Sequence, residues 1–281
     1  MHDRVLPSEA LTLAPRRQRA EGQITIAAVR RGAATRVQRI AEAGSSRVRL
    51  PRTHDATLEA VLINTGGGVA CGDHFSIRAD VGADADLVLT TPAAEKVYRS
   101  DGPIAEMNVQ LSLGPKAGIA WLPQETILFD RARIRRRFEA DLAVDARLSM
   151  FETVVFGRRA RNEQVTQGLL EDHWLIRRDG RPIFADALRL SGPIADLLDR
   201  PAVADGARVL ATFLHFEPEI ESRLDSVRGI LVDSTCLCGV SARRGVLAVR
   251  FLASEIFALR TEFRRFFAAF SGRSLPRVWS S

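Results

Sequence analysis

Short stretches of alternating apolar and polar residues dominate the chain from Gln23 onward, and alternation of this kind predicts β-strands. The stretches are Gln23 to Val29, Leu58 to Ile63, Phe75 to Val81, Leu87 to Thr91, Met107 to Leu113, Ala207 to Phe216, Gly229 to Val240 and Gly245 to Leu252. Gly, Pro and Asp residues separate them, as at Asp101-Gly102-Pro103. The pattern therefore predicts a mainly β fold.

A weak internal repeat runs through the middle of the chain. Val81 to Leu87 and Leu113 to Ile119 are each a turn of small residues that enters an apolar strand, and they lie 32 residues apart. Glu125 to Phe129 is echoed by Glu152 to Phe156, 27 residues later. Periods near 30 residues suggest β layers that each bury a face on the next. Because the spacing is uneven, we expect irregular, superhelical stacking of the sheets.

Helical signals are few. Pro193 to Leu198 and Glu219 to Val227 each fit a short helix. The clearest helix runs from Ser254 to Phe270, with a serine cap and Gly272 as its stop. Its apolar residues recur at helical spacing along one face, namely Ile256, Leu259, Phe263, Phe266, Phe267 and Phe270. We expect this C-terminal amphipathic helix to pack on the sheet.

Composition places the chain among ordinary globular proteins, with 46% apolar and 26% charged residues. Residues 1–22 are polar and arginine-rich and are expected to be loose, which leaves 23–281 as a single β domain. No apolar run approaches the ~18 residues that span a bilayer. The N-terminus lacks the apolar region of a secretory signal. We therefore expect a cytoplasmic protein that does not bind membranes.

The net charge of +6 comes almost wholly from arginine, because Lys96 and Lys116 are the only lysines. The arginines are scattered among 34 acidic residues, which favours a solvated surface with ion pairs. Arginine also contacts carboxylates in a bidentate manner, so protein partners suit this surface better than nucleic acid does. A basic β module that binds nucleic acid or protein, with no role in handling a metal ion, is the alternative.

Familiar catalytic and metal-binding motifs do not occur in the sequence. The glycine run Asn64 to Asp73 lacks the lysine of a phosphate-binding loop and continues as a strand, so it predicts a tight turn. Cys236 and Cys238 would point to one face of a strand, but two thiols do not complete a zinc or nickel site. Buried structural cysteines are the favoured interpretation. Neither a nucleophile elbow nor a Cys–His signature is found, so the chain is not expected to be an enzyme.

Polar groups within the most apolar strands are the remaining candidates for function, namely Asp73, Thr90, Glu125, Asp130 and Glu152. A buried carboxylate is costly unless it is paired or hydrated. One explanation is pairing with arginines such as Arg99, Arg158 and Arg159. The other is a water-filled passage lined by oxygen atoms, which bind a divalent ion more weakly than Cys and His do. The sequence leaves both explanations open.

Several long motifs resemble those of the urease accessory protein D family, also called UreH. They are Ile63-Asn64-Thr65-Gly66-Gly67-Gly68 with Gly72-Asp73, Leu89-Thr90-Thr91-Pro92-Ala93-Ala94-Glu95-Lys96-Val97-Tyr98-Arg99, Trp121-Leu122-Pro123-Gln124-Glu125-Thr126-Ile127-Leu128-Phe129-Asp130, Phe156-Gly157-Arg158-Arg159-Ala160 and Pro276-Arg277-Val278-Trp279. Their order and spacing agree with the family from about residue 24 to 279. Ala70 and Cys71 depart from the family's usual loop.

The resemblance implies an all-β scaffold with a few helices and no catalytic activity of its own. It implies a chaperone that binds apo-urease and the accessory proteins F and G, where G is a GTPase, and it brings in the nickel metallochaperone E as a further partner. It implies no permanently bound cofactor but Ni²⁺ in transit to the urease active site. The polar groups within apolar strands, and not the resemblance, make Asp73, Thr90, Glu125, Asp130 and Glu152 the candidates to line or gate the passage. Glu95, Lys96 and Arg99 are the candidates for an interface.

Overall fold

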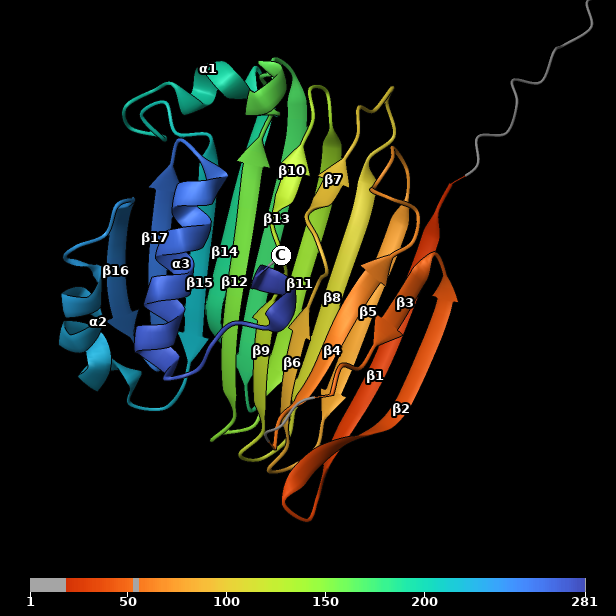
Figure 1. Cartoon of the computed structure of the whole chain (residues 1–281), viewed down its shortest axis with the longest axis vertical. Helices are drawn as coiled ribbons and strands as arrows, with labels where there is room; N and C mark the ends of the chain where they lie inside the picture. The colour runs from red at the N-terminus through yellow and green to blue at the C-terminus, as the bar shows by residue number, and fades with distance from the viewer. Residues whose placement is uncertain (1–18, 53–55, 281) are drawn as a thin grey trace, which may run out of the picture.

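The computed structural model describes residues 19–52 and 56–280, and these form two facing β-sheets with three α-helices (Figure 1). The strands are β1 (Glu21–Arg31), β2 (Ala34–Gly44), β3 (Ser46–Arg49), β4 (Leu58–Asn64), β5 (His74–Val81), β6 (Asp86–Thr90), β7 (Glu95–Val97), β8 (Ala105–Leu113), β9 (Gly118–Leu122), β10 (Thr126–Leu128), β11 (Arg133–Leu142), β12 (Arg147–Phe156), β13 (Gly168–Arg178), β14 (Arg181–Gly192), β15 (Val209–Phe216), β16 (Leu237–Arg243) and β17 (Val246–Ala253). The helices are α1 (Ile194–Leu198), α2 (Leu224–Leu231) and α3 (Ile256–Ser271). The predicted mainly β, stacked fold is confirmed.

The chain alternates between the two sheets, so that successive coils stack in parallel. The seven-stranded sheet has the order β14-β13-β11-β8-β5-β1-β2. The ten-stranded sheet has the order β16-β17-β15-β12-β9-β6-β4-β3, and off this path β10 pairs with β12 and β7 pairs with β10. Strands β5, β8, β11 and β13 are parallel neighbours, as are β4, β6, β9 and β12. Antiparallel hairpins close both ends of each stack.

The repeated turns of small residues stack directly on one another. The amide of Asp84 donates to the carbonyl oxygen of Pro115 at 3.0 Å, and the amide of Gly118 donates to that of Ala85 at 2.9 Å. A third layer follows, in which the amide of Arg147 donates to the carbonyl oxygen of Ala117 at 2.9 Å. The predicted repeat is therefore a physical stack of turns, and its third member was not recognised in the sequence.

Two of the three clusters of buried apolar residues form extended layers. One fills the space between the sheets, with Ile26, Leu111 and Met150 fully buried. The other lies between the ten-stranded sheet and α3, which crosses in front of β15 and β17 (Figure 1). In this second layer Phe263 stacks on Phe151 and Phe266 meets Phe213 edge to face. The predicted docking of the phenylalanine stripe on the sheet is confirmed.

Two local predictions differ from the structure. Gly229 to Val240 is not one strand: its first residues belong to α2, and β16 begins only at Leu237. Ser254 does not cap α3, because Glu255 occupies the N-cap position and no side chain caps the helix there. Gly272 does end α3, with a φ of 66° that suits glycine.

The first strand, β1, begins at Glu21, two residues before the predicted strand Gln23 to Val29. Residues 1–18 of the segment expected to be loose lie outside the described residues.

Candidate functional site

A cluster of three charged side chains lies between the two sheets. Arg136 on β11 donates from Nη1 to Oε2 of Glu152 on β12 at 2.8 Å. It also donates from Nε to Oδ1 of Asp172 on β13 at 3.1 Å, and a second bond joins its Nη2 to Oδ2. The side chains of Arg136, Glu152 and Asp172 are only 7%, 12% and 6% exposed. One buried arginine therefore joins the sheets by bridging two carboxylates.

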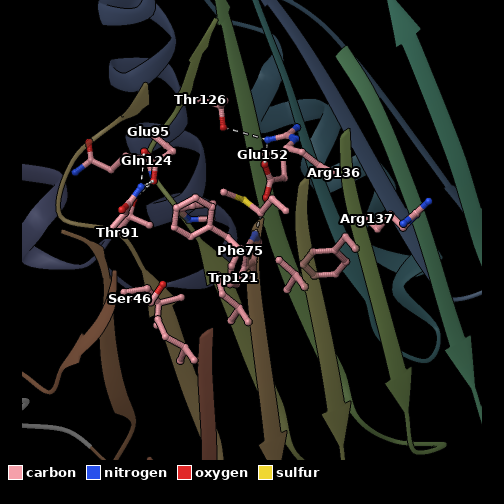
Figure 2. Close-up of a pocket in the computed structure, with 18 of the residues that line it drawn as sticks. Ser46, Phe75, Thr91, Glu95, Trp121, Gln124, Thr126, Arg136, Arg137 and Glu152 are labelled. Carbon is pink, nitrogen blue, oxygen red and sulfur yellow. Dashed lines mark hydrogen bonds and ion pairs between the residues drawn. The ribbon is translucent and has the colours of Figure 1, made fainter. Parts of the chain in front are cut away.

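Neutral donors and acceptors complete the cluster. Trp121 donates from Nε1 to Oε1 of Glu152 at 2.6 Å, and Arg136 donates from Nη1 to Oγ1 of Thr126 at 3.1 Å (Figure 2). Trp174 donates from Nε1 to Asp172 at 3.3 Å. Two carboxylates against one guanidinium leave one net negative charge. A buried negative charge that is hydrogen-bonded on several sides can attract a cation.

The electrostatics of the cluster follow from its burial. Burial raises the pKa of Glu152, and the neighbouring Arg136 opposes this only in part. Burial lowers the pKa of Arg136, but the charges of Asp172 and Glu152 raise it by more. The pKa of Arg136 therefore lies above its ordinary value. Arg136 therefore stays protonated, and Glu152 takes up a proton more readily than a glutamate in water does.

Strand alternation explains why these charged groups point inward. On β11, Arg136 shares its face with the buried Ile134 and Phe138. It is paired in register with Asp172 on the parallel neighbour β13. On β12, Glu152 lies on the inward face with Met150. Each residue thus occupies a position at which the apolar pattern would place a core side chain.

Cavities lie on both sides of the cluster. A small inner cavity of about 80 Å³ is lined by Arg136, Glu152 and Asp172, and also by the polar residues Asn64, Thr91, Glu95, Gln124 and Thr126 (Figure 2). A side cavity of about 320 Å³ is lined by the same three charged residues together with Asp186, Thr212, Arg250 and several apolar residues of β14 and β17. The cluster therefore stands between two polar-lined spaces.

Glu95 is the second carboxylate of the inner cavity. It is half-buried on β7, and Asn64 donates to it from Nδ2 at 3.3 Å. Burial raises its pKa to about 7, although the hydrogen bond from Asn64 opposes the shift. Lys96 and Arg99, predicted with it as interface residues, are exposed. The structure thus places Glu95 at the wall of the inner cavity and the other two on the surface.

Of the five residues predicted to line or gate a passage, Glu152 alone lines either of these two cavities. Asp73 instead accepts hydrogen bonds from the amides of Ala20 and Ala70, which fixes the glycine run against the start of β1. Thr90 donates to the carbonyl oxygen of Leu122 at 2.7 Å. The geometry gives both residues a role in holding the backbone.

Asp130 and Glu125 also make structural contacts. Asp130 accepts from the amide and the hydroxyl of Thr166 at 2.7 and 2.8 Å. Burial acts to raise the pKa of Asp130, but the hydrogen bonds from Thr166 and from the amide of Gln167 have the larger combined effect. The pKa of Asp130 is therefore lowered. Glu125 forms an ion pair with Arg260 of α3 at 2.9 Å. Neither carboxylate belongs to the cluster around Arg136.

The sequence echo between Glu125 and Glu152 does not match the register in which their strands pair. β10 and β12 are parallel neighbours, with Thr126 opposite Val154. The echo would have paired Thr126 with Thr153, so the true register is shifted by one residue. Because a shift of one residue exchanges the two faces of a strand, Glu152 points between the sheets whereas Glu125 points toward α3.

The conspicuous run from Leu122 to Asp130 holds the C-terminal part of the chain. Gln124 donates to the carbonyl oxygen of Val278 at 2.8 Å, and Trp279 donates from Nε1 to that of Leu122 at 3.2 Å. Arg260 contacts both Gln124 and Glu125. The run therefore forms the surface on which α3 and the residues that follow it dock.

The cysteines behave as buried thiols. Cys236 is 7% exposed, Cys238 is half-buried, and both pack against the apolar layer under α3. Burial raises the pKa of Cys236. Within residues 19–52 and 56–280, no three His, Cys, Asp or Glu side chains are grouped to hold a metal ion. In the same part of the chain, no helix is long and apolar enough to cross a membrane.

Arg136, Asp172 and Trp121 were missed as site residues. β11 contains four arginines, Arg133, Arg135, Arg136 and Arg137, and their similarity in sequence hides the buried one. The available signal was the alternation with Ile134 and Phe138, which puts Arg136 on the apolar face.

Comparisons with known proteins give one consistent result. The family model described as UreD urease accessory protein matches residues 20–280. The chain is 50% identical over 273 residues to "Urease accessory protein UreD" of Methylobacterium sp. (strain 4-46), covering 95% of this chain and 97% of that protein. It is 51% identical over 289 residues to "Urease accessory protein UreD 1" of Methylobacterium radiotolerans, covering all of both chains. A similar protein from Azorhizobium caulinodans is 50% identical over 267 residues, which is 95% of this chain and 98% of that protein.

Proposed function

Because the chain belongs to the UreD family of urease accessory proteins and so has a role in urease maturation, we propose that it acts as a scaffold without catalytic activity that conducts Ni²⁺ into apo-urease. Its partners are the urease structural subunits and the accessory proteins F and G, with the metallochaperone E as a further source of nickel. The setting is the cytoplasm. Ni²⁺ is the cargo and not a resident cofactor.

The observation that carries the proposal is the cluster of Arg136, Glu152 and Asp172 between two cavities. Carboxylate, hydroxyl and amide oxygens hold a divalent cation less tightly than thiolate or imidazole ligands do, so an ion can leave as well as enter. The inner cavity offers such oxygens from Glu95, Asn64 and Gln124. Its small volume suits a few water molecules and an ion, and not an organic ligand.

Arg136 has the role of a gate in this proposal. Its positive charge opposes a dication, and its ion pairs hold it across the path between the cavities. A Ni²⁺ ion that binds Glu152 would replace Arg136 as the counter-charge, which favours withdrawal of the guanidinium toward Asp172. Asp73, Thr90, Glu125 and Asp130 are therefore given structural roles in the proposal, and Glu152 retains the passage role.

The test is nickel transfer in the assembled complex of this chain with the F and G proteins. Glu152→Gln keeps the shape and the hydrogen-bond acceptor for Trp121 but removes the negative charge. We expect it to lower the nickel content of urease, with the complex intact. Glu139→Gln, which removes a carboxylate 42% exposed on the outer face of β11, is the matched control and should leave nickel content unchanged.

Two outcomes would contradict the proposal. If Glu152→Gln and Glu152→Leu both left the nickel content of urease unchanged in a correctly assembled complex, the passage would not run past this cluster. If the folded chain formed no complex with the F and G proteins in co-purification, the scaffold role would fail.

A further inference from the structure

A larger pocket of about 550 Å³ lies on the outer face of the ten-stranded sheet, between β6, β9, β12 and β15 and the C-terminal end of α3. Arg147 and Ser149 face it, whereas Met150 and Glu152 on the same strand face the interior. The pocket shares no lining residue with the inner or the side cavity. It is therefore independent of the proposed nickel passage.

Four arginines line this pocket. Arg147 pairs with Asp86 at 3.4 Å, and Arg223 donates to the carbonyl oxygen of Phe270 at 2.5 Å. Arg273 and Arg277 are exposed, and in the described part of the chain their side chains have no hydrogen-bond or ion-pair partner. The planar guanidinium group binds carboxylates and phosphates through two parallel hydrogen bonds. This pair of arginines therefore favours an anionic ligand group.

The carboxylates of the pocket limit the charge of that ligand. Glu59, Asp86 and Glu217 line the pocket with the arginines. The hydrogen bond from His215 lowers the pKa of Glu217, so this carboxylate stays ionised. The four arginines of the lining exceed these three carboxylates by one charge, so a ligand with a single negative charge balances the pocket. A single carboxylate on the ligand meets this condition.

Ser149, His215 and Glu217 form a chain of hydrogen bonds in the wall. His215 Nε2 lies 3.2 Å from Glu217 Oε2, and Ser149 Oγ lies 2.8 Å from His215 Nδ1. An ionised carboxylate only accepts, which assigns the ring proton to Nε2 and makes Ser149 the donor to Nδ1. These three groups satisfy one another. They do not compete with a ligand for Arg273 and Arg277.

The rest of the lining is apolar. Leu122, Phe267, Phe270 and Leu275 line the pocket between the sheet and the end of α3. The volume falls within the range of about 300–1,000 Å³ that is usual for pockets that bind small molecules. A rim that carries Arg273 and Arg277 beside an apolar floor suits a ligand with an anionic head group and an apolar body.

We propose that this pocket binds a small organic monocarboxylate, whose apolar or aromatic body lies on Leu122, Phe267 and Phe270 and whose carboxylate pairs with Arg273 and Arg277. The source of the carboxylate is either a free organic acid or the C-terminus of a peptide. Both offer the same head group and an apolar neighbour, and the experiment distinguishes them.

The experiment is calorimetric titration of the full chain with 3-phenylpropanoate, and in a second arm with a short peptide that ends in phenylalanine. 3-Phenylpropanol tests the charge, and inorganic phosphate tests the apolar body. The double variant Arg273→Gln/Arg277→Gln removes both guanidinium groups. Arg39→Gln/Arg243→Gln is the matched control, because both residues are exposed, lie outside the pocket and change the net charge equally.

We expect 3-phenylpropanoate to bind the wild type and the control alike, and the double variant about tenfold or more weakly, which corresponds to the loss of a charge-assisted contact. Tighter binding of the peptide would identify a chain terminus as the source, and weaker binding a free acid. Equal affinity for the alcohol, equal affinity for phosphate, or unchanged binding to the double variant would overturn the proposal.

Discussion

The ion pair between Glu125 and Arg260 joins the run Leu122 to Asp130 to α3, and a double-mutant cycle can measure its contribution. The perturbations are Glu125→Gln, Arg260→Gln and both together. The Glu125 side chain is 5% exposed, that of Arg260 is 31% exposed, and their charged atoms lie 2.9 Å apart. The pair is thus intermediate between a surface ion pair and a buried one.

The magnitude follows from two opposing effects. Two unit charges at this separation attract by about 6 kcal/mol at an effective dielectric constant near 20. Desolvation of the nearly buried carboxylate removes several kcal/mol of that gain, whereas Arg260 is partly hydrated and loses less. We therefore expect a coupling energy of about 1–2 kcal/mol, and about 2–3 kcal/mol of destabilisation for Glu125→Gln alone, because it leaves Arg260 without its counter-charge.

The assay is urea unfolding of the four proteins, followed by far-ultraviolet circular dichroism. The same variants are then compared for nickel transfer to urease, and Glu125→Gln should transfer nickel as the wild type does. A coupling energy below about 0.5 kcal/mol would refute the account of the ion pair, since it would equal that of an exposed pair. If a stable Glu125→Gln protein lost nickel transfer, Glu125 would instead have the role in the passage that the sequence predicted.

Three further predictions concern the other buried groups. Arg136→Met should lower the free energy of unfolding by about 3–5 kcal/mol near pH 7, because two buried carboxylates lose their counter-charge, and the deficit should shrink in acid as Glu152 is protonated. The pKa of Glu95 is about 7 in the folded chain and 4.5 in the unfolded chain, so the folded state favours the protonated side chain. The resulting contribution to folding stability is fully present below pH 4.5 and is lost as the pH rises through 7. Relative to Glu95→Gln, the unfolding free energy of the wild type should therefore fall by up to about 3 kcal/mol across that window, and parallel pH profiles would contradict this. Trp279→Ala should cost about 3 kcal/mol in urea unfolding and loosen α3, because the buried indole packs on Phe151 and Phe263 and donates to Leu122.

Much of the fold follows from local pattern. Strands such as β4, β5 and β8 are recognisable because their alternation persists for several residues and ends at Gly, Pro or Asp. The prediction of a strand from Gly229 to Val240 was wrong because, over so short a length, its apolar residues fit both the helical and the strand period. Val227 and Leu231, four residues apart, are buried on one face of α2, and this helical spacing begins before the segment that was interpreted as a strand.

The site depended far more on tertiary structure. The family, the β architecture, the stacked turns and the docking helix could be predicted from the sequence, since each is encoded in long motifs or regular spacing. The sequence also marked Glu152 as a charged residue within an apolar strand. Which carboxylates share a space depends on how the strands pair, because a shift of one residue between β10 and β12 turns Glu125 and Glu152 to opposite faces. The partner of Glu152 is Arg136 from the other sheet, and no local pattern carries a contact between sheets.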